Sequence, residues 1–143
     1  MIGIDTLSLR MERHLSNAIK VAEYLNTHKK VKWVNFPGLT EHTDHETAKK
    51  MFGNKGFGGM IAFGLENENQ CFSFIDNLEM IYHLANLGDC KTLIIHPWSS
   101  QYISFDPKVK KGLMITPDLL RFSVGIENVD DIINDLNQAL EKI

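Results

Sequence analysis

The sequence lacks the features of a membrane-spanning, exported or nucleic-acid-binding protein. Its longest apolar stretches, MIAFGL (60–65) and TLIIH (92–96), are far shorter than the roughly 18 residues that a membrane helix needs. The N-terminal segment MIGIDTLSLRMERH has no basic start followed by an apolar core, so it does not resemble a signal peptide. The formal net charge of -3 leaves no basic stripe for nucleic acid. We therefore expect neither a membrane nor a nucleic-acid partner.

Cysteine and arginine are both scarce. The two cysteines, Cys71 and Cys90, are far apart, and neither has a second cysteine at metal-ligand spacing. This pattern favours buried, reduced thiols in a cytoplasmic protein over a disulfide. Only Arg10, Arg13 and Arg121 supply guanidinium groups. The position of each arginine is therefore informative.

The chain is long enough to fold as one domain. It has 143 residues, of which 43% are hydrophobic and 23% charged, and contains no repeat or low-complexity tract. A chain of this size buries roughly 68–70% of its unfolded surface.

Hydrophobic periodicity and turn residues predict alternating helices and strands. A long amphipathic helix is expected from about residue 6 to 27, with an apolar stripe at Met11, Leu15, Ala18, Ala22 and Leu25. No obvious capping residue precedes it, which suits a connecting element between domains. Further helices are expected at 45–53, 66–78 and 128–143, strands at 31–38, 58–65, 80–89, 91–97 and 119–126, and a loop at 98–117. In the last helix Asn128 is the expected N-cap, and the expected apolar stripe is Val129, Ile132, Ile133, Leu136, Leu140 and Ile143. This order predicts an α+β fold, an α/β sandwich in which helices cover one face of a small sheet.

The stretch LLRFSVGIENVDD (119–131) places an arginine in the middle of an alternating strand. Leu120, Phe122 and Val124 share one face, which predicts a half-buried strand. Arg121 lies on the other face near Ser123, where a flat anion has room to approach. A surface salt bridge on an edge strand explains Arg121 equally well, because a guanidinium serves either role.

Other motifs have simpler structural explanations. HTDHE (42–46) places two histidines beside two acids, but no further zinc ligand has convincing spacing, so a solvated helix start is favoured. GNKGFGG (53–59) resembles a phosphate loop but precedes a strand, whereas phosphate loops follow one. Ser99 and Ser100 near His96 lack the surroundings of a hydrolase nucleophile. Asn86 in HLANLGD reads, by itself, as a strand end or turn.

Five segments, in order, resemble the C-terminal domain of the pyridoxal-phosphate enzymes of cysteine and methionine metabolism. They are LSLRMERHLSNAIKVAEYL, VNFPGL, GFGGMIAFGL, HLANLGDCKTLIIHP and TPDLLRFSVGIENVDDIINDLNQAL, and they cover nearly the entire chain. Among these enzymes the O-acetylhomoserine sulfhydrylases are most similar. The resemblance implies the small C-terminal domain of a fold-type I enzyme, with residues 1–27 as the interdomain connecting helix and residues 28–143 as the domain itself.

The resemblance also implies roles for individual residues. The arginine of R-x-S-V-G-x-E binds the α-carboxylate of the amino-acid substrate in this family, a role that falls on Arg121. The residue before LGD helps to hold that carboxylate and corresponds to Asn86, while Gly88 and Ser99 are candidates for lining the pocket. The implied reaction is γ-replacement, in which sulfide or a thiol displaces acetate from O-acetylhomoserine to give homocysteine or methionine.

Two departures from the family pattern stand out. After HP the family usually reads Ala-Ser-Thr-Thr-His, whereas here WSSQY (98–102) retains only Ser99, with bulky Trp98 and Tyr102 beside it. In addition, no lysine has the Ser-x-Thr-Lys-like context of the Schiff-base lysine. We expect no catalytic, cofactor-binding or metal-ligating residue in this chain: pyridoxal phosphate would be bound by an N-terminal domain absent from it, in a cytoplasmic homo-oligomer, expected to be a tetramer. The chain alone is expected to be inactive, and a stand-alone amino-acid-binding or regulatory module is the alternative.

Overall fold

A five-stranded mixed sheet forms the centre of the computed structural model, which describes residues 2–143. The strands are β1 (Trp33–Asn35), β2 (Met60–Gly64), β3 (Tyr82–His83), β4 (Leu93–Ile95) and β5 (Leu119–Ser123). Their order across the sheet is β1-β2-β5-β4-β3, and only β3 and β4 run parallel. The strand that carries Arg121 is therefore central.

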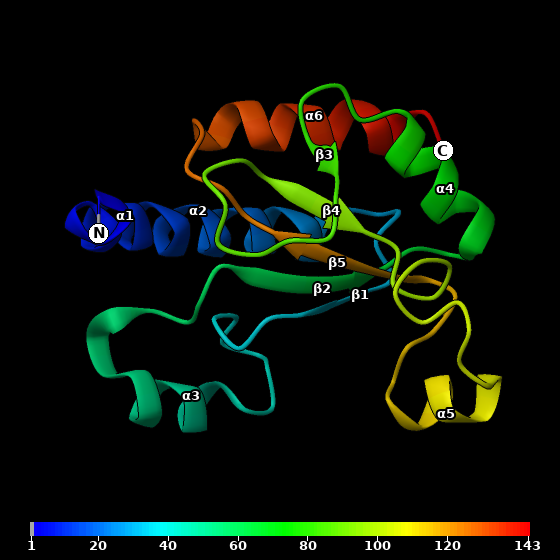
Figure 1. Ribbon diagram of the computed structural model, residues 1–143, viewed down its shortest axis with the longest axis horizontal. Helices are drawn as coiled ribbons and strands as arrows, with labels where there is room; N and C mark the ends of the chain where they lie inside the picture. Colours follow the sequence, from blue (N-terminus) through cyan, green and yellow to red (C-terminus); the bar gives the residue numbers. More distant parts are fainter. Residues whose placement is uncertain (1) are drawn as a thin grey trace.

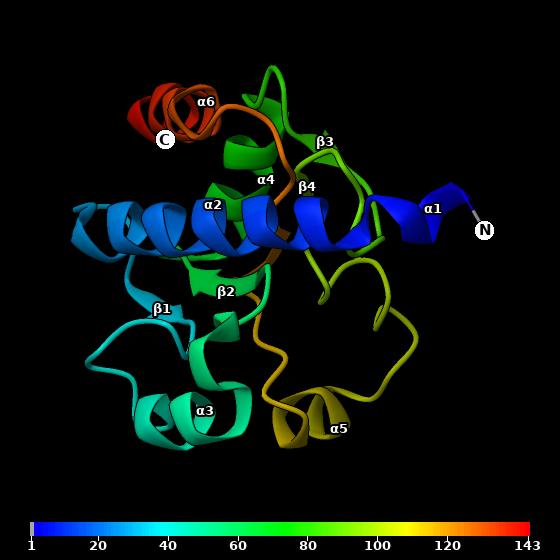
Figure 2. The same ribbon diagram turned by 90° about the vertical axis from the view of Figure 1, so that its left-hand side faces the viewer.

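Three helices cover one face of this sheet (Figures 1 and 2): α2 (Leu7–Thr27), α4 (Glu68–Asp76) and α6 (Val129–Glu141). The shorter helices are α1 (Ile2–Asp5), α3 (His45–Phe52), the 3-10 turn η1 (Gly53–Lys55) and α5 (Pro107–Gly112). In both views α3 and α5 lie on the side of the sheet away from α6. The predicted α+β fold is confirmed, with the three longest helices on one face.

The core lies between the sheet and the three long helices. Phe63 on β2 contacts Phe122 on β5 and Phe74 on α4 edge to face, with ring centroids 6.2 and 6.0 Å apart. All three rings are fully buried. Such contacts combine a large buried apolar area with a favourable ring geometry. No helix within residues 2–143 is long and apolar enough to cross a membrane.

The long N-terminal helix is confirmed, but its buried face differs from the predicted stripe. Ala18, Ala22 and Leu25 are fully buried, whereas Met11 is 37% exposed and Leu15 is partly buried. His14 and Asn17 are buried instead because they bond to the chain that follows β5: His14 Nδ1 to the Val124 carbonyl at 2.6 Å, and Asn17 Nδ2 to the Gly125 carbonyl at 3.1 Å. Hydrogen bonds therefore determine this end of the helix face.

Local signals locate two further helix ends correctly. The side chain of Asn128 accepts a hydrogen bond from the Asp130 N–H, so the predicted N-cap of α6 is confirmed. Gly53 follows the last residue of α3 with a φ of 58°, as expected for a glycine that ends a helix. Three predicted stripe positions of α6, Ile132, Leu136 and Leu140, are fully buried.

Four predictions were wrong in part. The segment 98–117 contains helix α5, begun by the Asp106 side chain accepting from the Lys108 N–H. The strand predicted at 80–89 pairs only over Tyr82–His83, since the residues that follow form an exposed loop. β5 is not half-buried, because Leu119 and Ser123 on its second face are also buried. Both cysteines are free and Cys71 is buried, but Cys90 is exposed.

Candidate functional site

Arg121 stands in a row of side chains that crosses the sheet on the face away from α2 and α6. The strand register places it opposite Ala62 on β2 and Ile95 on β4, and Ala62 is opposite Asn35 on β1. Directly paired residues project from the same face of a sheet. Asn35, Ala62 and Arg121 therefore lie side by side along one face.

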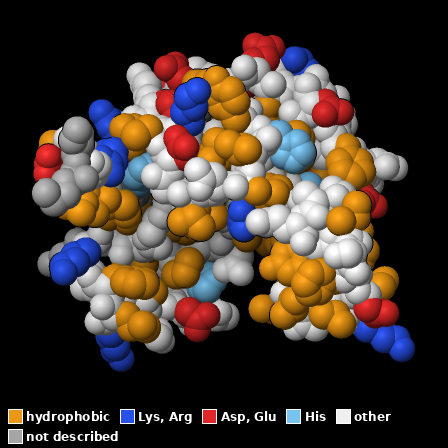
Figure 3. Space-filling model, viewed as in Figure 1, with side chains coloured by type: hydrophobic (Ala, Val, Ile, Leu, Met, Phe, Trp, Pro, Cys, Tyr) orange, Lys and Arg blue, Asp and Glu red, His pale blue; other side chains and the backbone are white. Residues whose placement is uncertain are grey.

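These three residues line a cavity of about 250 Å³. The remaining lining comes from the segment between β4 and β5 and from the first residue of β5: Pro97, Gln101, Tyr102, Leu113, Met114, Ile115 and Leu119. The volume is slightly below the roughly 300–1,000 Å³ of sites for drug-sized ligands, which suits a smaller molecule. Figure 3 shows the surface hollowed between the lobe that carries α3 and the lobe that carries α5. The cavity lies on this side of the sheet.

The guanidinium of Arg121 has no protein partner among the groups that the structure describes. No salt bridge or hydrogen bond joins it to a described residue, although the side chain is only partly exposed. The prediction of a surface salt bridge on an edge strand is thus wrong on both points. A half-buried guanidinium with unused donors in a cavity is suited to bind an anion, because the planar fork matches a carboxylate in two hydrogen bonds.

The bulky residues that depart from the family pattern have different positions. Tyr102 lines the Arg121 cavity and packs edge to face on Phe105 at 5.3 Å. Trp98 instead lies under Lys110, whose Nζ is 4.3 Å from the ring centroid and donates to the Trp98 carbonyl at 3.2 Å. Tyr102 therefore shapes the cavity, and Trp98 holds a buried lysine in place.

Ser99 does not line the cavity but bonds to the buried His96. Nε2 of His96 is 2.8 Å from the Pro117 carbonyl, which can only accept, so Nε2 carries the proton. Nδ1 then accepts from the Ser99 hydroxyl at 2.7 Å. Both ring nitrogens are used, and the pair ties the chain after β4 to the chain before β5. A structural role explains these residues without a hydrolase.

Asn86 and Gly88 lie on an exposed loop beside Arg121's strand but outside its cavity. The Gly88 N–H donates to the Ser123 hydroxyl at 3.3 Å, two residues from Arg121 on the same face. Asn86 accepts from the Leu87 N–H at 2.9 Å through Oδ1. Gly88 lines a neighbouring cavity of about 180 Å³ with Leu87 and Ser123. The structure does not bring Asn86 and Arg121 into one cavity.

The sequence SVGIE after Arg121 is explained by packing. A Cβ at Gly125 would lie 2.2 Å from the Glu127 carboxylate and 2.6 Å from the Cys90 carbonyl, so only glycine fits. The Glu127 carboxylate accepts from the Thr92 N–H at 2.6 Å and from the Thr92 hydroxyl at 2.8 Å. These contacts fix the end of β5 against the start of β4.

The two remaining motifs, HTDHE and GNKGFGG, have structural roles. His42 and His45 bond to Asn35 Oδ1 and the Pro37 carbonyl, each at 2.8 Å, and no cluster of three or more metal-ligating side chains occurs among the described residues. GNKGFGG forms η1 and a turn before β2, in which Gly56 and Gly58 have φ values of 92° and 88°. Neither motif faces the Arg121 cavity.

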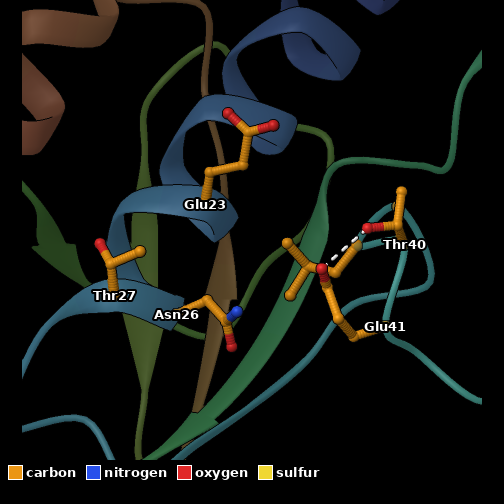
Figure 4. Close-up of a pocket in the computed structure, with 7 residues that line it drawn as sticks. Glu23, Asn26, Thr27, Thr40 and Glu41 are labelled. Carbon is orange, nitrogen blue, oxygen red and sulfur yellow. Dashed lines mark hydrogen bonds between the residues drawn. The ribbon is translucent and has the colours of Figure 1, made fainter.

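A second cavity, of about 240 Å³, has the opposite electrostatic character (Figure 4). Glu23, Asn26 and Thr27 reach it from α2, and Thr40 and Glu41 from the turn after β1. A backbone hydrogen bond at Glu41 lowers the pKa of its carboxyl group. The Thr40 hydroxyl, which donates to this carboxylate at 2.9 Å, lowers that pKa further. Two carboxylates would repel an anionic ligand, so this cavity does not suit the kind of ligand that the Arg121 cavity can bind.

The Arg121 cavity does not fit a lysine-bound pyridoxal phosphate. None of its lining residues within the described chain is a lysine. Lys110, which is buried, uses its Nζ on the carbonyls of Trp98 and Ile103, at 3.2 and 3.5 Å. An ammonium held in this way is not free to attack a carbonyl.

Sequence reasoning missed part of the cavity. Asn35, Gln101 and the segment 113–115 were not singled out, because they come from three separate parts of the chain. The pairing of β1 with β2 and the position of α5 bring them to Arg121. Asn35 could have been identified as a neighbour of Arg121 only if the register of β1 against β2 had been known.

Comparisons with known proteins identify the family. Residues 1–141 match the model of the Cys/Met metabolism PLP-dependent enzyme family. The chain is 44% identical to the O-acetyl-L-homoserine sulfhydrylase of Leptospira meyeri and 45% identical to the L-methionine gamma-lyase of Fusobacterium nucleatum subsp. polymorphum. Each comparison covers 99% of this chain but only 32% and 35% of the relative. The chain thus spans about a third of the length of these relatives.

A solved structure agrees with this assignment. The fold matches a crystal structure from Campylobacter jejuni, assigned as an O-acetylhomoserine (thiol)-lyase and containing N'-pyridoxyl-lysine-5'-monophosphate. The TM-score is 0.93 at 38% identity, over 97% of this chain and 33% of the other. A fold match of this quality and a family match over nearly all residues lead to one conclusion: the chain belongs to the Cys/Met metabolism PLP-dependent enzyme family.

Proposed function

We propose that this chain is the substrate-binding C-terminal domain of an enzyme like O-acetylhomoserine sulfhydrylase. The observation that carries the proposal is the Arg121 guanidinium, which faces a cavity of about 250 Å³ without a partner among the described residues. The α-carboxylate of an amino acid supplies the planar anion that such a group binds. Arg121 therefore anchors one end of the substrate and fixes its orientation.

The proposed reaction is replacement at the γ-carbon of O-acetylhomoserine. The carbon–oxygen bond to acetate breaks, a carbon–sulfur bond forms with sulfide or a thiol, and the proton of the nucleophile is released. Pyridoxal phosphate, when bound, supplies the electron sink for this chemistry. The residues of this chain hold the carboxylate and line the cavity, in which Tyr102 narrows the space beside Arg121.

Asn86, Gly88 and Ser99 are proposed to support this site from its edge. Asn86 is a second carboxylate ligand in this proposal, because its loop is joined to Ser123 through Gly88. Its Nδ2 has only a 3.5 Å contact with Asp89, which is too long for a strong hydrogen bond. The amide is therefore available to a ligand. Ser99 acts through His96 by holding the strand end that leads to the cavity.

The domain organisation follows from the same proposal. Residues 1–27 form the connecting helix, residues 28–143 form the small domain, and a large domain binds pyridoxal phosphate. Exposed apolar side chains gather near α5 (Figure 3), namely Ile103, Phe105, Val109, Leu113 and Met114. Such a patch is typical of a surface that another domain or subunit covers. The complete enzyme is proposed to be a cytoplasmic homo-oligomer, and the chain alone to be inactive.

Adding pyridoxal phosphate to the 143-residue chain tests its inactivity. We expect no stoichiometric absorbance band from a lysine-bound cofactor, and no specific lysine labelled after borohydride reduction, because no lysine lines the cavity. A stoichiometric band trapped at one lysine would contradict the proposal. If the chain binds amino acids but gives no γ-replacement when it is joined to a pyridoxal-phosphate-binding domain of this family, a stand-alone binding module is favoured instead.

Replacing Arg121 tests the carboxylate anchor. In the complete enzyme that contains this domain, Arg121→Ala is expected to cost roughly 2–5 kcal/mol of substrate binding, as for loss of one partner of a hydrogen-bonded charge pair. The matched control is Arg13→Ala, which removes an exposed guanidinium from α2 outside the cavity. A kcat/KM equal to that of the control would refute the assignment.

A further inference from the structure

Asn35 stands in the same cross-strand row as Arg121, separated from it only by the small side chain of Ala62. All three residues line the cavity. Adjacent strands are about 4.8 Å apart, so two strand spacings separate the backbones of Asn35 and Arg121. A ligand held by the guanidinium lies within reach of the amide, since alanine leaves the space between them open.

A histidine fixes the orientation of this amide. Nδ1 of His42 accepts from the Asp44 N–H at 3.0 Å, so this nitrogen carries no proton. Nε2 must then carry the proton and donate to Asn35 Oδ1 at 2.8 Å. With its oxygen engaged, Asn35 has the Nδ2 amino group left for other partners. The side chain is thus set as a donor rather than an acceptor.

No other use of that amino group is present in the described structure. Asn35 is exposed, and its only side-chain hydrogen bond to a described residue is the one from His42. The turn between β1 and α3 holds the histidine in place, since the His42 N–H donates to the Leu39 carbonyl at 3.1 Å. The HTDHE motif therefore has a function in the fold that its sequence did not reveal.

We propose that Asn35 is a further hydrogen-bond donor to the anionic end of the ligand at Arg121, and that His42 is the residue that positions it. This inference rests on the proposed function, because it adds a ligand, beside Asn86 on the neighbouring loop, for the carboxylate that Arg121 holds. A neutral donor beside the guanidinium helps to orient the bound anion. It does so without the cost of removing water from a second charged side chain. Asn35 is placed in the cavity by the strand register, whereas Asn86 lies on a loop outside it.

The test is a titration of the 143-residue chain, with 15N-labelled side chains, by O-acetyl-L-homoserine and by its α-carboxamide, which keeps the ammonium group but lacks the carboxylate. The wild-type chain is expected to bind the carboxylate form more tightly, with shifts at Arg121 Nε and Asn35 Nδ2. Asn35→Ala is expected to weaken binding of the carboxylate form about tenfold, as for loss of a hydrogen bond to a charged group. Asn35→Asp has the same shape and should weaken it further, since it adds a like charge.

His42→Ala separates positioning from direct contact. If His42 acts through Asn35, the single variant loses part of the affinity and adds no loss when combined with Asn35→Ala, a non-additivity that general destabilisation does not produce. His42→Gln retains an N–H donor and should restore part of the binding. Asn134→Ala, an exposed amide on α6 across the sheet, is the control and should bind like the wild type.

The outcomes distinguish the two proposals. Binding that requires Arg121 but is unchanged in Asn35→Ala and Asn35→Asp overturns the role of Asn35 and leaves the carboxylate anchor intact. Binding that does not depend on Arg121, or no preference for the ligand with the carboxylate, overturns the anchor itself. Additive losses from His42→Ala and Asn35→Ala overturn the positioning role of His42 alone.

Discussion

The two faces of strands β2 and β5 differ sharply although they come from the same ten residues. On the helix-covered face, Ile61, Phe63 and Phe122 are at most 1% exposed and contact one another and the helices. On the other face, Ala62 and Arg121 continue the row from Asn35 and line a cavity. The side chains of the first face are buried against one another and the helices, which stabilises the fold. The second face has hydrogen-bond donors without a partner among the described residues.

This difference indicates how a small domain can be stable and still bind. Because the strand period is two, alternate residues can serve the core and the cavity independently. Changes on the helix-covered face should therefore alter folding, and changes in the cavity row should alter binding with little effect on folding. Three stability measurements, from the largest expected effect to the smallest, test this separation.

The largest effect is expected from Phe122→Ala. Removing this fully buried ring should lower the free energy of unfolding by about 3–5 kcal/mol, a large part of the stability of a typical domain. Urea denaturation followed by circular dichroism measures it. Phe105→Ala, which removes a ring that is 44% exposed on the other side, should cost less than about 1 kcal/mol. If both variants lost a similar amount of unfolding free energy, the two faces would contribute equally to stability and the proposed separation would be wrong.

A smaller, pH-dependent effect is expected from Asp118, next to β5 on the cavity side. Its carboxylate accepts from the Trp33 indole at 2.8 Å, above Gly64, where a Cβ would lie 2.0 Å from the indole nitrogen. Although burial raises the pKa of Asp118, hydrogen bonds from Thr116 and Trp33 outweigh it and hold the pKa below its ordinary value. The charged form is therefore favoured in the folded state.

A lowered folded-state pKa stabilises the fold above the unfolded pKa, near 3.9, and that stabilisation is lost as pH falls through the folded pKa. We therefore expect Asp118→Asn to unfold at a lower urea concentration than the wild type at pH 7, and the difference to shrink below about pH 4. Urea midpoints at pH 7, 5 and 3 measure it. A difference that stays constant across this range would exclude the charge as the cause.

The helix-covered face could largely be predicted from the sequence, because local chemistry determines it. The apolar stripe of α6 and its Asn128 cap follow from spacing and side-chain type within one segment. The prediction was less accurate where distant residues supply the partners. His14 and Asn17 are buried because carbonyls more than 100 residues away accept their hydrogen bonds.

The cavity could be predicted only in part. Arg121 was found because a charged residue interrupts an alternating strand, and the family resemblance gave it a role. Asn35 has no such signal: it becomes a neighbour of Arg121 through the pairing of β1, β2 and β5. Helix α5 was missed because it is a short segment between polar residues, and its position depends on Lys110 bonding to Trp98 and Ile103.

The smallest effect is expected at Met114, which lines the cavity. Its φ of 57° is the only positive value among the described non-glycine residues. Met114 lies two residues after the end of α5, where the N–H groups of Met114 and Ile115 donate to the carbonyls of Lys111 and Lys110 at 3.0 and 2.9 Å. Glycine is favoured at this helix end because a side chain is strained there. Met114→Gly should therefore raise the free energy of unfolding by up to about 1 kcal/mol.

Met51 provides a matched comparison, because its side chain is 75% exposed, against 79% for Met114, but it lies within helix α3. Met51→Gly should lower the free energy of unfolding by about 0.5–1 kcal/mol, since glycine is unfavourable inside a helix. Opposite signs for two equally exposed methionines would show that the cavity wall retains backbone strain. If both variants were destabilised, the Met114 side chain would contribute to folding, and the cavity side could no longer be separated from the stability of the domain.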